Sequence, residues 1–332
     1  MRLTVLLGGT SSERNVSLAS GLRMAAALRE AGHEVRLLDP ATGPIGADVE
    51  ERLRERSVGT SPPSVGELAA LKLNDQTPTL PTHPLVRDAE CVVLALHGGQ
   101  GEDGTVQALL DVAGVRYTGS GAMATAIAMD KDMTKRILVH AGVPTAHWRM
   151  TPVDADAAIG YLGLPLIVKP NREGSTVGLT IVKERGQFEG AVAEAHRFDR
   201  EVMCETFVAG RELTVPVLAG VALPVGEIIP VKEIYDYECK YTPGMAREVF
   251  PADLPPEMTA SVQRYAERAY VALKLRGCAR IDFRLTDDGT LACLEANTLP
   301  GMTALSLVPQ SAAAAGVSFV EFCDRLVQDA VR

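Results

Sequence analysis

The segment from Gly277 to Pro309 constrains the fold of this chain more than any other. It contains two apolar runs, Cys278–Leu285 and Thr290–Ala296, separated by Asp287-Asp288-Gly289. Apolar runs that flank an Asp-Gly pair predict an antiparallel β-hairpin, because Asp-Gly adopts the positive-φ turn that joins such strands. We therefore expect a hairpin whose loop is the two-residue pair Asp288-Gly289.

This loop determines which residues face each other across the hairpin, residues 278–297. Asp282 then lies opposite Glu295, and Arg280 lies opposite Asn297. Alternation along a strand puts all four side chains on one face. Two carboxylates in opposite positions lie roughly 4.5–5.5 Å apart at Cβ and repel each other. A hard cation such as Mg²⁺ would relieve the repulsion, because it binds oxygen ligands, and the amide would supply another. The alternative is a solvated face with scattered charge.

Two neighbouring features favour a magnesium–nucleotide site over a solvated face. The guanidinium of Arg280 can bind a phosphate or a developing oxyanion through two parallel hydrogen bonds. The segment 297–303 contains Pro300, Gly301 and two threonines where the hairpin would otherwise simply end. That composition is typical of a loop shaped around a ligand.

The composition limits the classes of protein to consider. A length of 332 residues predicts two or three domains. The net charge of −9 argues against nucleic acid as a partner. Six cysteines without C-x-x-C spacing predict buried thiols in a reducing compartment rather than a zinc site or disulfides. The chain begins directly with a strand-like run, and its apolar runs are too short to span a membrane. We therefore expect a cytoplasmic protein without membrane association.

The first forty residues predict a βαβ unit that opens a parallel sheet. An apolar run at 2–8 is followed by a glycine turn, by helical periodicity over Val16–Ala31 and by a strand at Val35–Leu38. Glu13 stands at the start of that helix. Its carboxylate either complements the helix dipole or binds a ligand's ammonium group at the carboxyl end of the first strand. Residues 41–84 are rich in proline and predict a surface excursion with no chemistry of its own.

A second loop contains the spacing G-x-G-x-x-G of dinucleotide-binding proteins. The predicted strand Cys91–Leu96 is followed by His97 and then by this motif at Gly99–Gly104. Glu102 and Asp103 weaken the motif, because they would place negative charge where a pyrophosphate must lie. An NAD-linked oxidoreductase is therefore a less favoured alternative. The histidine is either a capped loop residue or a substrate contact.

The middle of the chain offers basic groups and a loop suited to phosphates. Helical periodicity over Ala122–Ala141 predicts one helix that carries Lys131, which by base rate would be a solvated lysine. The predicted strand Leu164–Lys169 ends in a lysine and is followed by a loop, Gly174–Gly178, and a second, antiparallel strand. A loop of glycines and hydroxyl residues can offer several backbone N–H groups to phosphate oxygens, and a lysine at the strand end adds a point charge.

Acidic and aromatic residues follow in the next part of the chain. Glu205 lies in the predicted strand Glu201–Val208, and Glu212 follows a turn. These two acids either bracket an adenosine or are exposed residues at strand ends. The aromatic and charged segment 235–250 is typical of a mobile cover over a site. The chain closes with a predicted helix at Ala312–Val331.

Taken in order, these motifs resemble the D-alanine–D-alanine ligases of the ATP-grasp superfamily. The residues that carry the resemblance are Glu13 and the motifs HGGQGEDG, KPNREGSTVG, YDYECKY, RID, EAN and PGMTALSLVP. It covers nearly the whole chain except residues 41–84, and the order of several motifs makes it specific. Two departures are mild: Thr176 stands where a second serine is usual, and Asn15 replaces a common acid.

The resemblance implies an α/β protein with the ATP-grasp fold. A parallel-sheet domain over residues 1–120 would be followed by two α+β domains, 121–200 and 201–332, that clamp ATP under a lid loop, 235–250. The implied activity is the ATP-dependent joining of two D-alanines through a D-alanyl phosphate, for peptidoglycan precursor synthesis. It implies two Mg²⁺ or Mn²⁺ ions and a homodimer. Other ATP-grasp carboxylate–amine ligases and non-catalytic nucleotide-binding modules remain alternatives.

The resemblance also implies a role for individual residues. The expected ATP contacts are Lys131, Lys169, Ser175, Glu205, Val208, Glu212 and Lys240. The expected metal ligands are Asp282, Glu295 and Asn297. The expected substrate contacts are Glu13, His97, Arg280, Gly301, Ser306 and Leu307, with Glu13 on the ammonium of the first D-alanine. The expected catalytic residues are Glu13, Ser175, Tyr241, Arg280 and Gly301, and the family links Ser175 and Tyr241 to Glu13 by hydrogen bonds.

Overall fold

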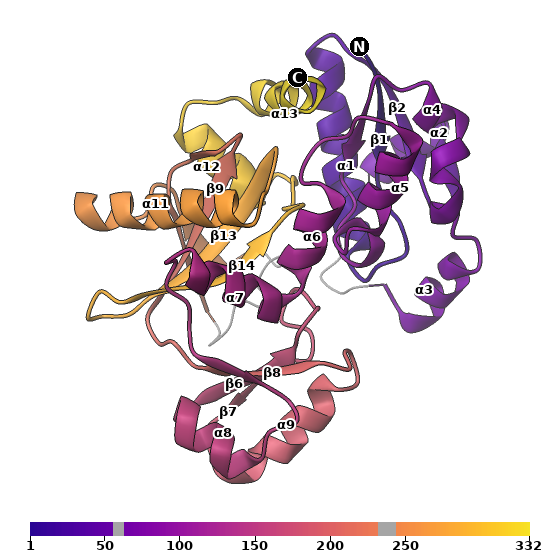
Figure 1. Ribbon diagram of the computed structural model, residues 1–332. Helices are drawn as coiled ribbons and strands as arrows, with labels where there is room; N and C mark the ends of the chain where they lie inside the picture. The colour runs from indigo at the N-terminus through magenta and orange to yellow at the C-terminus, as the bar shows by residue number, and fades with distance from the viewer. Residues whose placement is uncertain (56–62, 232–243) are drawn as a thin grey trace.

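The computed structural model describes residues 1–55, 63–231 and 244–332. Its strands form three sheets that lie in different parts of the molecule (Figure 1). The N-terminal sheet lies beside the C-terminal sheet, and the central sheet projects away from both of them. One mainly parallel sheet followed by two antiparallel sheets is the α/β architecture expected from the sequence.

The N-terminal sheet has the strand order β3-β2-β1-β4 and confirms the predicted βαβ unit. Its three longer strands run parallel, and β3 pairs antiparallel with β2 at the edge. Leu3 and Val5 of β1 pack on one face with α1 and α13, whereas Leu6 packs on the other with α5. A sheet covered on both faces is typical of parallel strands. The elements are β1 (Arg2–Leu6), α1 (Arg14–Glu30), β2 (Glu34–Asp39), β4 (Cys91–Leu94) and α5 (Thr105–Ala113).

The predicted surface excursion at residues 41–84 contributes to the core of this domain. Leu80 is almost fully buried and packs in the same cluster as Leu6 and Leu94. The segment contains β3 (Gly43–Ile45), α2 (Ala47–Arg54), α3 (Val65–Lys72), η1 (Thr77–Thr82) and α4 (Pro84–Arg87).

The central sheet is antiparallel throughout and has the order β5-β8-β6-β7. Two helices, α8 and α9, bury their apolar residues against it. Strand β8 lies beyond the predicted boundary at residue 200 but pairs with β5 and β6, so this sheet extends to Thr206. The elements are β5 (Trp148–Met150), α8 (Ala155–Leu162), β6 (Leu166–Pro170), β7 (Thr180–Val182), η3 (Arg185–Gln187), α9 (Phe188–Ala195) and β8 (Val202–Thr206).

The C-terminal sheet has the order β12-β11-β9-β13-β14, and β10 pairs with β9. Helices α6, α7 and α11 pack against it in the second large apolar cluster. The elements are α6 (Ala122–Met129), α7 (Lys131–His140), β9 (Arg211–Leu218), β10 (Val221–Ala222), β11 (Gly226–Pro230), β12 (Ala246–Val249), α11 (Pro256–Ala272), β13 (Cys278–Leu285), β14 (Leu291–Asn297), α12 (Leu307–Ala314) and α13 (Phe319–Val331).

Two helices predicted as continuous are each broken in the structure. The predicted helix Ala122–Ala141 divides into α6 and α7 at Asp130, whose backbone is extended and whose carboxylate accepts a hydrogen bond from the amide of Met133. An aspartate that satisfies a free N–H at a helix start competes with helix continuation. The predicted helix Ala312–Val331 is likewise replaced by α12 and α13, because Gly316 adopts a φ of 76° and Ser318 caps α13.

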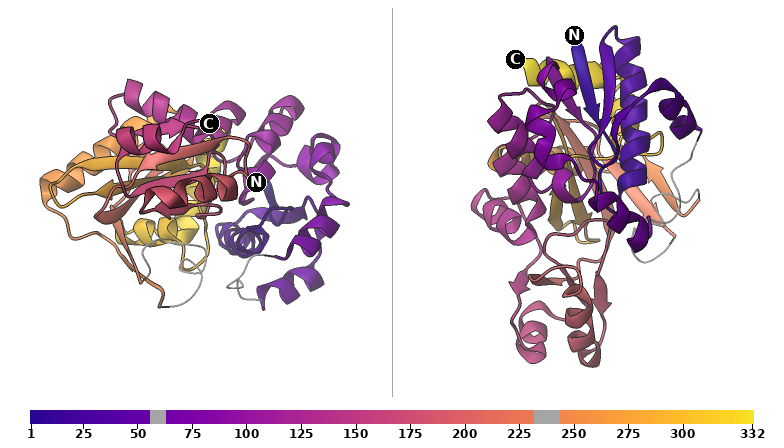
Figure 2. Two further views of the ribbon diagram at one scale, coloured as in Figure 1. Left: turned by 90° about the horizontal axis from the view of Figure 1, so that it is seen from below. Right: turned by 90° about the vertical axis from the view of Figure 1, so that its right-hand side faces the viewer.

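The last helix returns to the N-terminal domain. Helix α13 packs against α1, and its Phe322 lies in the same apolar cluster as Leu22. The guanidinium of Arg23 lies over the ring of Phe319, 3.7 Å from its centroid. Both chain termini consequently lie at the same end of the molecule (Figures 1 and 2).

The hairpin has the predicted pairing at its open end but a different loop. Arg280 pairs with Asn297 and Asp282 with Glu295, whereas Phe283 pairs with Cys293 because a bulge interrupts the register. Beyond the bulge the strands are joined by a three-residue loop, 287–289, rather than by the predicted pair. The predicted two-residue loop is therefore wrong, and the bulge restores the pairing that it implied.

Two findings concern the thiols and the helices. The free, buried cysteines predicted from the sequence are present at Cys91, Cys204, Cys278, Cys293 and Cys323, and Cys239 lies outside the described residues. Among the helices of the described residues, none combines the length and the apolar character needed to cross a membrane.

Candidate active site

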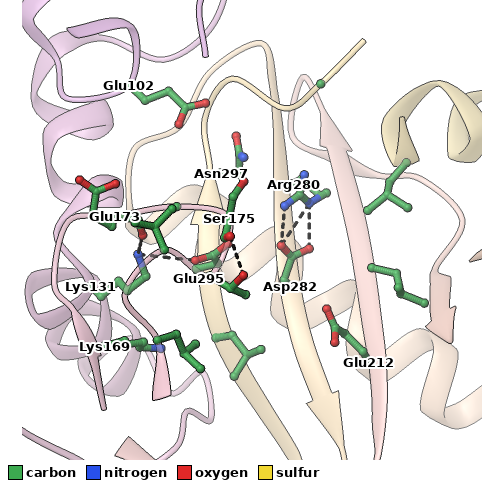
Figure 3. A pocket seen from close by; sticks show the side chains of 18 of the residues that line it. Glu102, Lys131, Lys169, Glu173, Ser175, Glu212, Arg280, Asp282, Glu295 and Asn297 are labelled. Atoms are coloured by element: carbon green, nitrogen blue, oxygen red, sulfur yellow. Dashed lines mark hydrogen bonds and ion pairs between the residues drawn. The ribbon is translucent and has the colours of Figure 1, made fainter. Parts of the chain in front are cut away.

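A cavity of about 240 Å³ lies where the three sheets meet (Figure 3). Every predicted site residue that the structure describes lines this cavity. These residues are Glu13, His97, Lys131, Lys169, Ser175, Glu205, Val208, Glu212, Arg280, Asp282, Glu295, Asn297, Gly301, Ser306 and Leu307. The other two predicted residues, Lys240 and Tyr241, lie outside the described residues, as does the start of the predicted lid loop.

One end of the cavity is lined by Glu205 of β8, whose carboxylate pairs with Lys169 in the cavity wall and with Lys135 behind it. The carboxylate is 3% exposed, and its Oε2 accepts a hydrogen bond of 2.7 Å from Nζ of Lys169. Its Oε1 forms an ion pair with Lys135 of α7. Burial acts to raise the pKa of Glu205, but the two ammonium groups outweigh it and hold the pKa at about 2. Lys135 was not among the predicted site residues.

Arg284 connects two further residues at this end. Its Nη1 lies 3.2 Å from Oε2 of Glu212, and its Nε donates to the carbonyl of Val208 at 3.1 Å. Arg284 belongs to β13, so it fixes the segment between β8 and β9 to the C-terminal sheet. Strand alternation signals this residue, because Arg280, Asp282 and Arg284 share one face of the hairpin.

Lys131 lies toward the middle of the cavity. Its Nζ donates a hydrogen bond of 2.5 Å to the carbonyl of Glu173 and lies 3.7 Å from Oε2 of Glu295. Burial lowers the pKa of Lys131, and the carboxylate of Glu295 partly opposes this. The solvated lysine expected from base rates is thus not what the structure contains.

The loop between β6 and β7 approaches this lysine. Ser175 and Thr176 have φ values of 51° and 61°, a left-handed conformation that is uncommon for residues other than glycine. Such strain is concentrated at ligand-binding loops. Glu173 from the same loop lines the cavity, and burial raises the pKa of its carboxyl.

The paired carboxylates of the hairpin carry basic partners. Nε and Nη2 of Arg280 donate to Asp282 at 2.9 and 2.8 Å, and the hydroxyl of Thr214 donates to the same carboxylate at 2.7 Å. In Figure 3, Asp282, Glu295 and Asn297 line one side of the cavity.

The chemistry of this donor set fits Mg²⁺ or Mn²⁺. Two carboxylates and an amide oxygen are hard ligands, and Mg²⁺ typically completes its shell with substrate phosphates and water. Within the described residues, no group of three or more His, Cys, Asp or Glu side chains is arranged to hold a metal by itself. Phosphate oxygens of a ligand would complete the shell of a metal held by these residues.

The charge of the residues around the cavity also favours a metal bound together with a ligand. Among the described residues that line it, seven carry carboxylates and four are lysines or arginines. A triphosphate added to this acidic surface would be repelled unless cations accompanied it. The cavity is therefore suited to a metal–nucleotide complex rather than to a free polyanion.

Glu13 occupies the other end of the cavity. It is the N-cap residue of α1, but its carboxylate makes no capping hydrogen bond. Its Oε1 instead accepts a hydrogen bond of 2.8 Å from the hydroxyl of Ser175. The side chain is thus directed toward the cavity, which favours the ligand-binding alternative over helix capping.

Glu102 lines the cavity near Glu13 and was not a predicted site residue. Burial raises the pKa of its carboxyl, and the nearby imidazole of His97 partly opposes this. Oε1 of Glu102 lies 3.9 Å from Nδ1 of His97. That nitrogen is also 2.8 Å from the carbonyl of Leu299, and Nε2 is 3.0 Å from Oγ of Ser20. His97 is therefore held by the protein on both ring nitrogens while its surface lines the cavity.

The glycine motif in this loop does not form a dinucleotide site. Gly99–Gly101 forms a short 3₁₀ turn, η2. A Cβ atom at Gly104 would lie 2.6 Å from the carbonyl oxygen of Ala122, so α6 closes off the N-terminus of α5. A pyrophosphate needs that N-terminus open, and the oxidoreductase alternative is not supported.

The segment after the hairpin completes this end of the cavity. A Cβ atom at Gly301 would lie 2.8 Å from Oγ of Ser306, so a larger residue here would have to displace that hydroxyl. Oγ of Ser306 accepts from the amide of Thr303 at 3.0 Å. Helix α12 begins at Leu307, and the N–H groups at its start favour an anionic group in the cavity.

Comparison with known proteins identifies first the class and then the family. A solved structure from Bacillus anthracis, described as D-alanine–D-alanine ligase complexed with ATP, superposes with a TM-score of 0.79 and 30% identity. The match covers 100% of this chain and 98% of that one. The fold is thus that of an ATP-grasp ligase.

The family follows from the sequence comparisons. Models of the D-ala D-ala ligase N-terminus and C-terminus match residues 2–120 and 137–328. A D-alanine–D-alanine ligase of Citrifermentans bemidjiense is 40% identical over 99% of this chain and 96% of its own length. One from Gluconobacter oxydans is also 40% identical, over 100% and 99%. The chain belongs to the D-alanine–D-alanine ligase family.

Proposed function

We propose that this protein is an ATP-dependent ligase that joins two D-alanine molecules into D-alanyl-D-alanine for the synthesis of peptidoglycan precursors. One observation carries the proposal: a single cavity is lined by the residues expected for the nucleotide, for the metal and for the amino acids. Together these residues come from all three sheets and from the loops that follow them, so their convergence is not a consequence of nearness in the sequence.

In the first step the carboxylate of one D-alanine attacks the γ-phosphorus of ATP, the bond to the leaving oxygen breaks, and ADP and D-alanyl phosphate form. Glu13 binds the ammonium group of that D-alanine. Lys131 and Lys169 supply positive charge beside the phosphates, and the backbone of the loop at Ser175 covers them. Catalysis of such a transfer comes mainly from positioning and electrostatic stabilisation.

In the second step the amine of the other D-alanine, having lost a proton, attacks the acyl carbon. A carbon–nitrogen bond forms, the carbon–oxygen bond breaks, and phosphate leaves. Arg280, the backbone at Gly301 and the start of α12 present donors to the acceptor's carboxylate and to the developing oxyanion, which is the arrangement that stabilises a tetrahedral intermediate.

Asp282, Glu295 and Asn297 would hold two Mg²⁺ or Mn²⁺ ions. When bound, these ions would neutralise phosphate charge and favour attack at the γ-phosphorus. Thr214 fixes the carboxylate of Asp282 from behind. Release of Arg280 from Asp282 would free its guanidinium for the substrate side of the cavity.

The remaining expectations concern the surroundings of the enzyme. The resemblance implies a homodimer, which sedimentation equilibrium would measure. A cytoplasmic location, without nucleic-acid or membrane partners, is expected from the thiol content and net charge. The division into domains at residues 120 and 200 is likewise a proposal, except that β8 extends the central sheet to Thr206.

The decisive experiment incubates the protein with ATP, Mg²⁺ and a panel of D- and L-amino acids. Phosphate release is followed, and the products are identified by mass spectrometry. The expected result is release of phosphate and formation of D-alanyl-D-alanine with D-alanine only. A different dipeptide would indicate another ATP-grasp ligase, and no phosphate release with any amino acid would favour a binding module.

A further inference from the structure

Lys135 is the most deeply buried charged side chain near the cavity, with no exposed surface. It lies on α7 one turn after Lys131, so both side chains leave the same face of the helix. Lys131 reaches the cavity, whereas Lys135 does not line it and contacts the lining residue Glu205. Removing an ammonium group from water costs free energy, so the contacts of Lys135 must offset that cost.

The surroundings of Lys135 hold its ammonium group in one place. Nζ donates to the hydroxyl of Thr145 at 2.6 Å and to the carbonyl of Ala146 at 3.2 Å, and it forms an ion pair with Oε1 of Glu205. Two of the three N–H donors of the lysine therefore have hydrogen-bond acceptors, and the ion pair with Glu205 adds a third contact. The ring of Trp148 lies 5.4 Å away and adds a favourable contact.

The two oxygens of Glu205 are held by different lysines. Oε1 is buried, accepts no hydrogen bond from the described residues and is paired with Lys135 by charge. Oε2 accepts from Lys169, which itself lines the cavity. Because Glu205 also lines the cavity and its Oε1 is enclosed, Oε2 is the oxygen that can meet a ligand.

The two lysines therefore differ in what they can do. In the proposed function, Lys169 contacts the phosphates of ATP, so its ammonium group interacts with both the phosphates and Glu205. A buried carboxylate left without a cation is strongly destabilised. Lys135 has no other anionic partner among the described residues, so it is the permanent counterion that lets Lys169 turn toward a nucleotide.

We propose that Lys135 is a positioning residue for the nucleotide base, which fixes Glu205 so that Oε2 accepts a hydrogen bond from the amino group of adenine. This inference rests on the proposed function, in which Glu205 contacts the base. Guanine carries a carbonyl oxygen where adenine carries its amino group, so a fixed carboxylate meets an acceptor and rejects it. A carboxylate that is free to turn away distinguishes adenine from guanine less well. The selectivity comes from the cost of leaving buried polar groups unpaired against the wrong base.

The test is the binding of ADP and GDP to the whole protein by calorimetry, in the presence of Mg²⁺ and without amino acid. Lys135→Met keeps an unbranched apolar side chain that is one atom shorter but removes the charge. Wild type is expected to bind ADP more tightly than GDP. The variant should bind ADP about 10-fold or more weakly, with GDP changed much less, as expected for loss of a charge-assisted hydrogen bond.

A matched control separates positioning from loss of stability. Leu138→Ala removes a fully buried side chain from the same helix without removing a charge near Glu205. It should lower the melting temperature and leave the ratio of the ADP and GDP dissociation constants at the wild-type value. If it changes the ratio as much as Lys135→Met does, the selectivity reflects the general order of α7 and the proposal fails.

A second comparison applies if Lys135→Met does not fold. Glu205→Gln removes the negative charge, so the double variant Lys135→Met/Glu205→Gln leaves no unpaired carboxylate at this point. If Lys135 acts through Glu205, the ADP to GDP ratio of the double variant should equal that of Glu205→Gln alone. A further 10-fold loss of selectivity in the double variant would overturn the proposal.

The outcomes also separate this inference from the proposed function. If wild type binds ADP and GDP equally well, Glu205 does not contact the amino group of adenine. That result would contradict the placement of the nucleotide in the proposed function. A selective wild type combined with an equally selective Lys135→Met would leave the proposed function standing and reject the role of Lys135 alone.

Discussion

The hydroxyl of Ser175 donates a hydrogen bond of 2.8 Å to Oε1 of Glu13, across 162 positions of the sequence. The bond joins the loop between β6 and β7 to the start of α1, and so connects the central sheet to the N-terminal one. Glu13 makes no capping hydrogen bond. Its role in the structure is therefore this inter-sheet contact and its place in the cavity wall.

The first prediction concerns this pair. Glu13→Gln keeps an oxygen that can accept from Ser175 but removes the charge that would bind an ammonium group. The rate with D-alanine should fall about 10- to 100-fold, because a hydrogen bond to a charged group is lost, while the melting temperature changes little. Ser175→Ala should lower the rate less. Steady-state kinetics and thermal melts check this, and equal small losses in rate and stability for Glu13→Gln would favour a capping role instead.

The second prediction concerns acid stability. The folded-state pKa of Glu205 is about 2, below the value of about 4.3 for an unfolded glutamate. The unfolded chain thus takes up the proton first as the pH falls. The contribution of Glu205 to stability is present above about pH 4.3 and is lost as the pH falls toward 2.

The measurement is urea unfolding at pH 7 and pH 3 for wild type and Glu205→Gln. Between pH 7 and pH 3, the free energy of unfolding should fall by roughly 2 kcal/mol less in the variant than in wild type. This difference is the part of the stabilisation by ionised Glu205 that wild type has lost at pH 3. The variant will also be less stable at pH 7, since Lys135 and Lys169 lose their partner, so only the difference between the two pH values tests the idea. The same pH dependence in both proteins would contradict it.

The hairpin shows how sequence reasoning can succeed locally. Alternation and the Asp-Gly pair predicted that Asp282 and Glu295 face each other, and they do. The loop is nevertheless one residue longer than predicted, and the bulge between Asp282 and Phe283 compensates for it. A bulge has no clear sequence signal here, because the strand remains apolar on both sides of it.

Other features depended on long-range packing and had no local signal. The break at Asp130 lies inside an alanine-rich stretch whose helical pattern continues through it, and the capping hydrogen bond to Met133 becomes visible only in the structure. The contact between Glu13 and Ser175 requires two sheets to meet. Lys135 did have a signal, its spacing of four from Lys131, but spacing alone does not distinguish a buried lysine from a solvated one.

The third prediction concerns the close approach at Gly301. Gly301→Ala would place a Cβ atom 2.8 Å from Oγ of Ser306 and so displace that side chain. When the rate is fitted with two binding steps for D-alanine, one half-saturating concentration should rise about 10-fold, because a shift of the acceptor site costs orientation. Gly160→Ala on α8 is the control, since a Cβ atom there meets nothing within 4 Å. Weakening of both binding steps by the same factor would contradict a local effect.

The last prediction concerns the metal. Glu295 and Asp282 are cross-strand partners that line the cavity, and the nearest described cation to Glu295 is Lys131 at 3.7 Å from its Oε2. Glu295→Gln keeps the shape and one carbonyl oxygen but removes a negative charge that a divalent cation requires. The Mg²⁺ concentration for half-maximal activity should rise at least about 10-fold, and binding of Mn²⁺ with ADP, followed by electron paramagnetic resonance, should weaken in parallel.

Asp287→Asn on the exposed loop of the same hairpin makes the same chemical change away from the cavity and should alter neither measurement. Because Glu295 is partly exposed, folding should survive in both variants. If Mn²⁺ binds to Glu295→Gln as it does to wild type, the carboxylate of Glu295 is not a metal ligand.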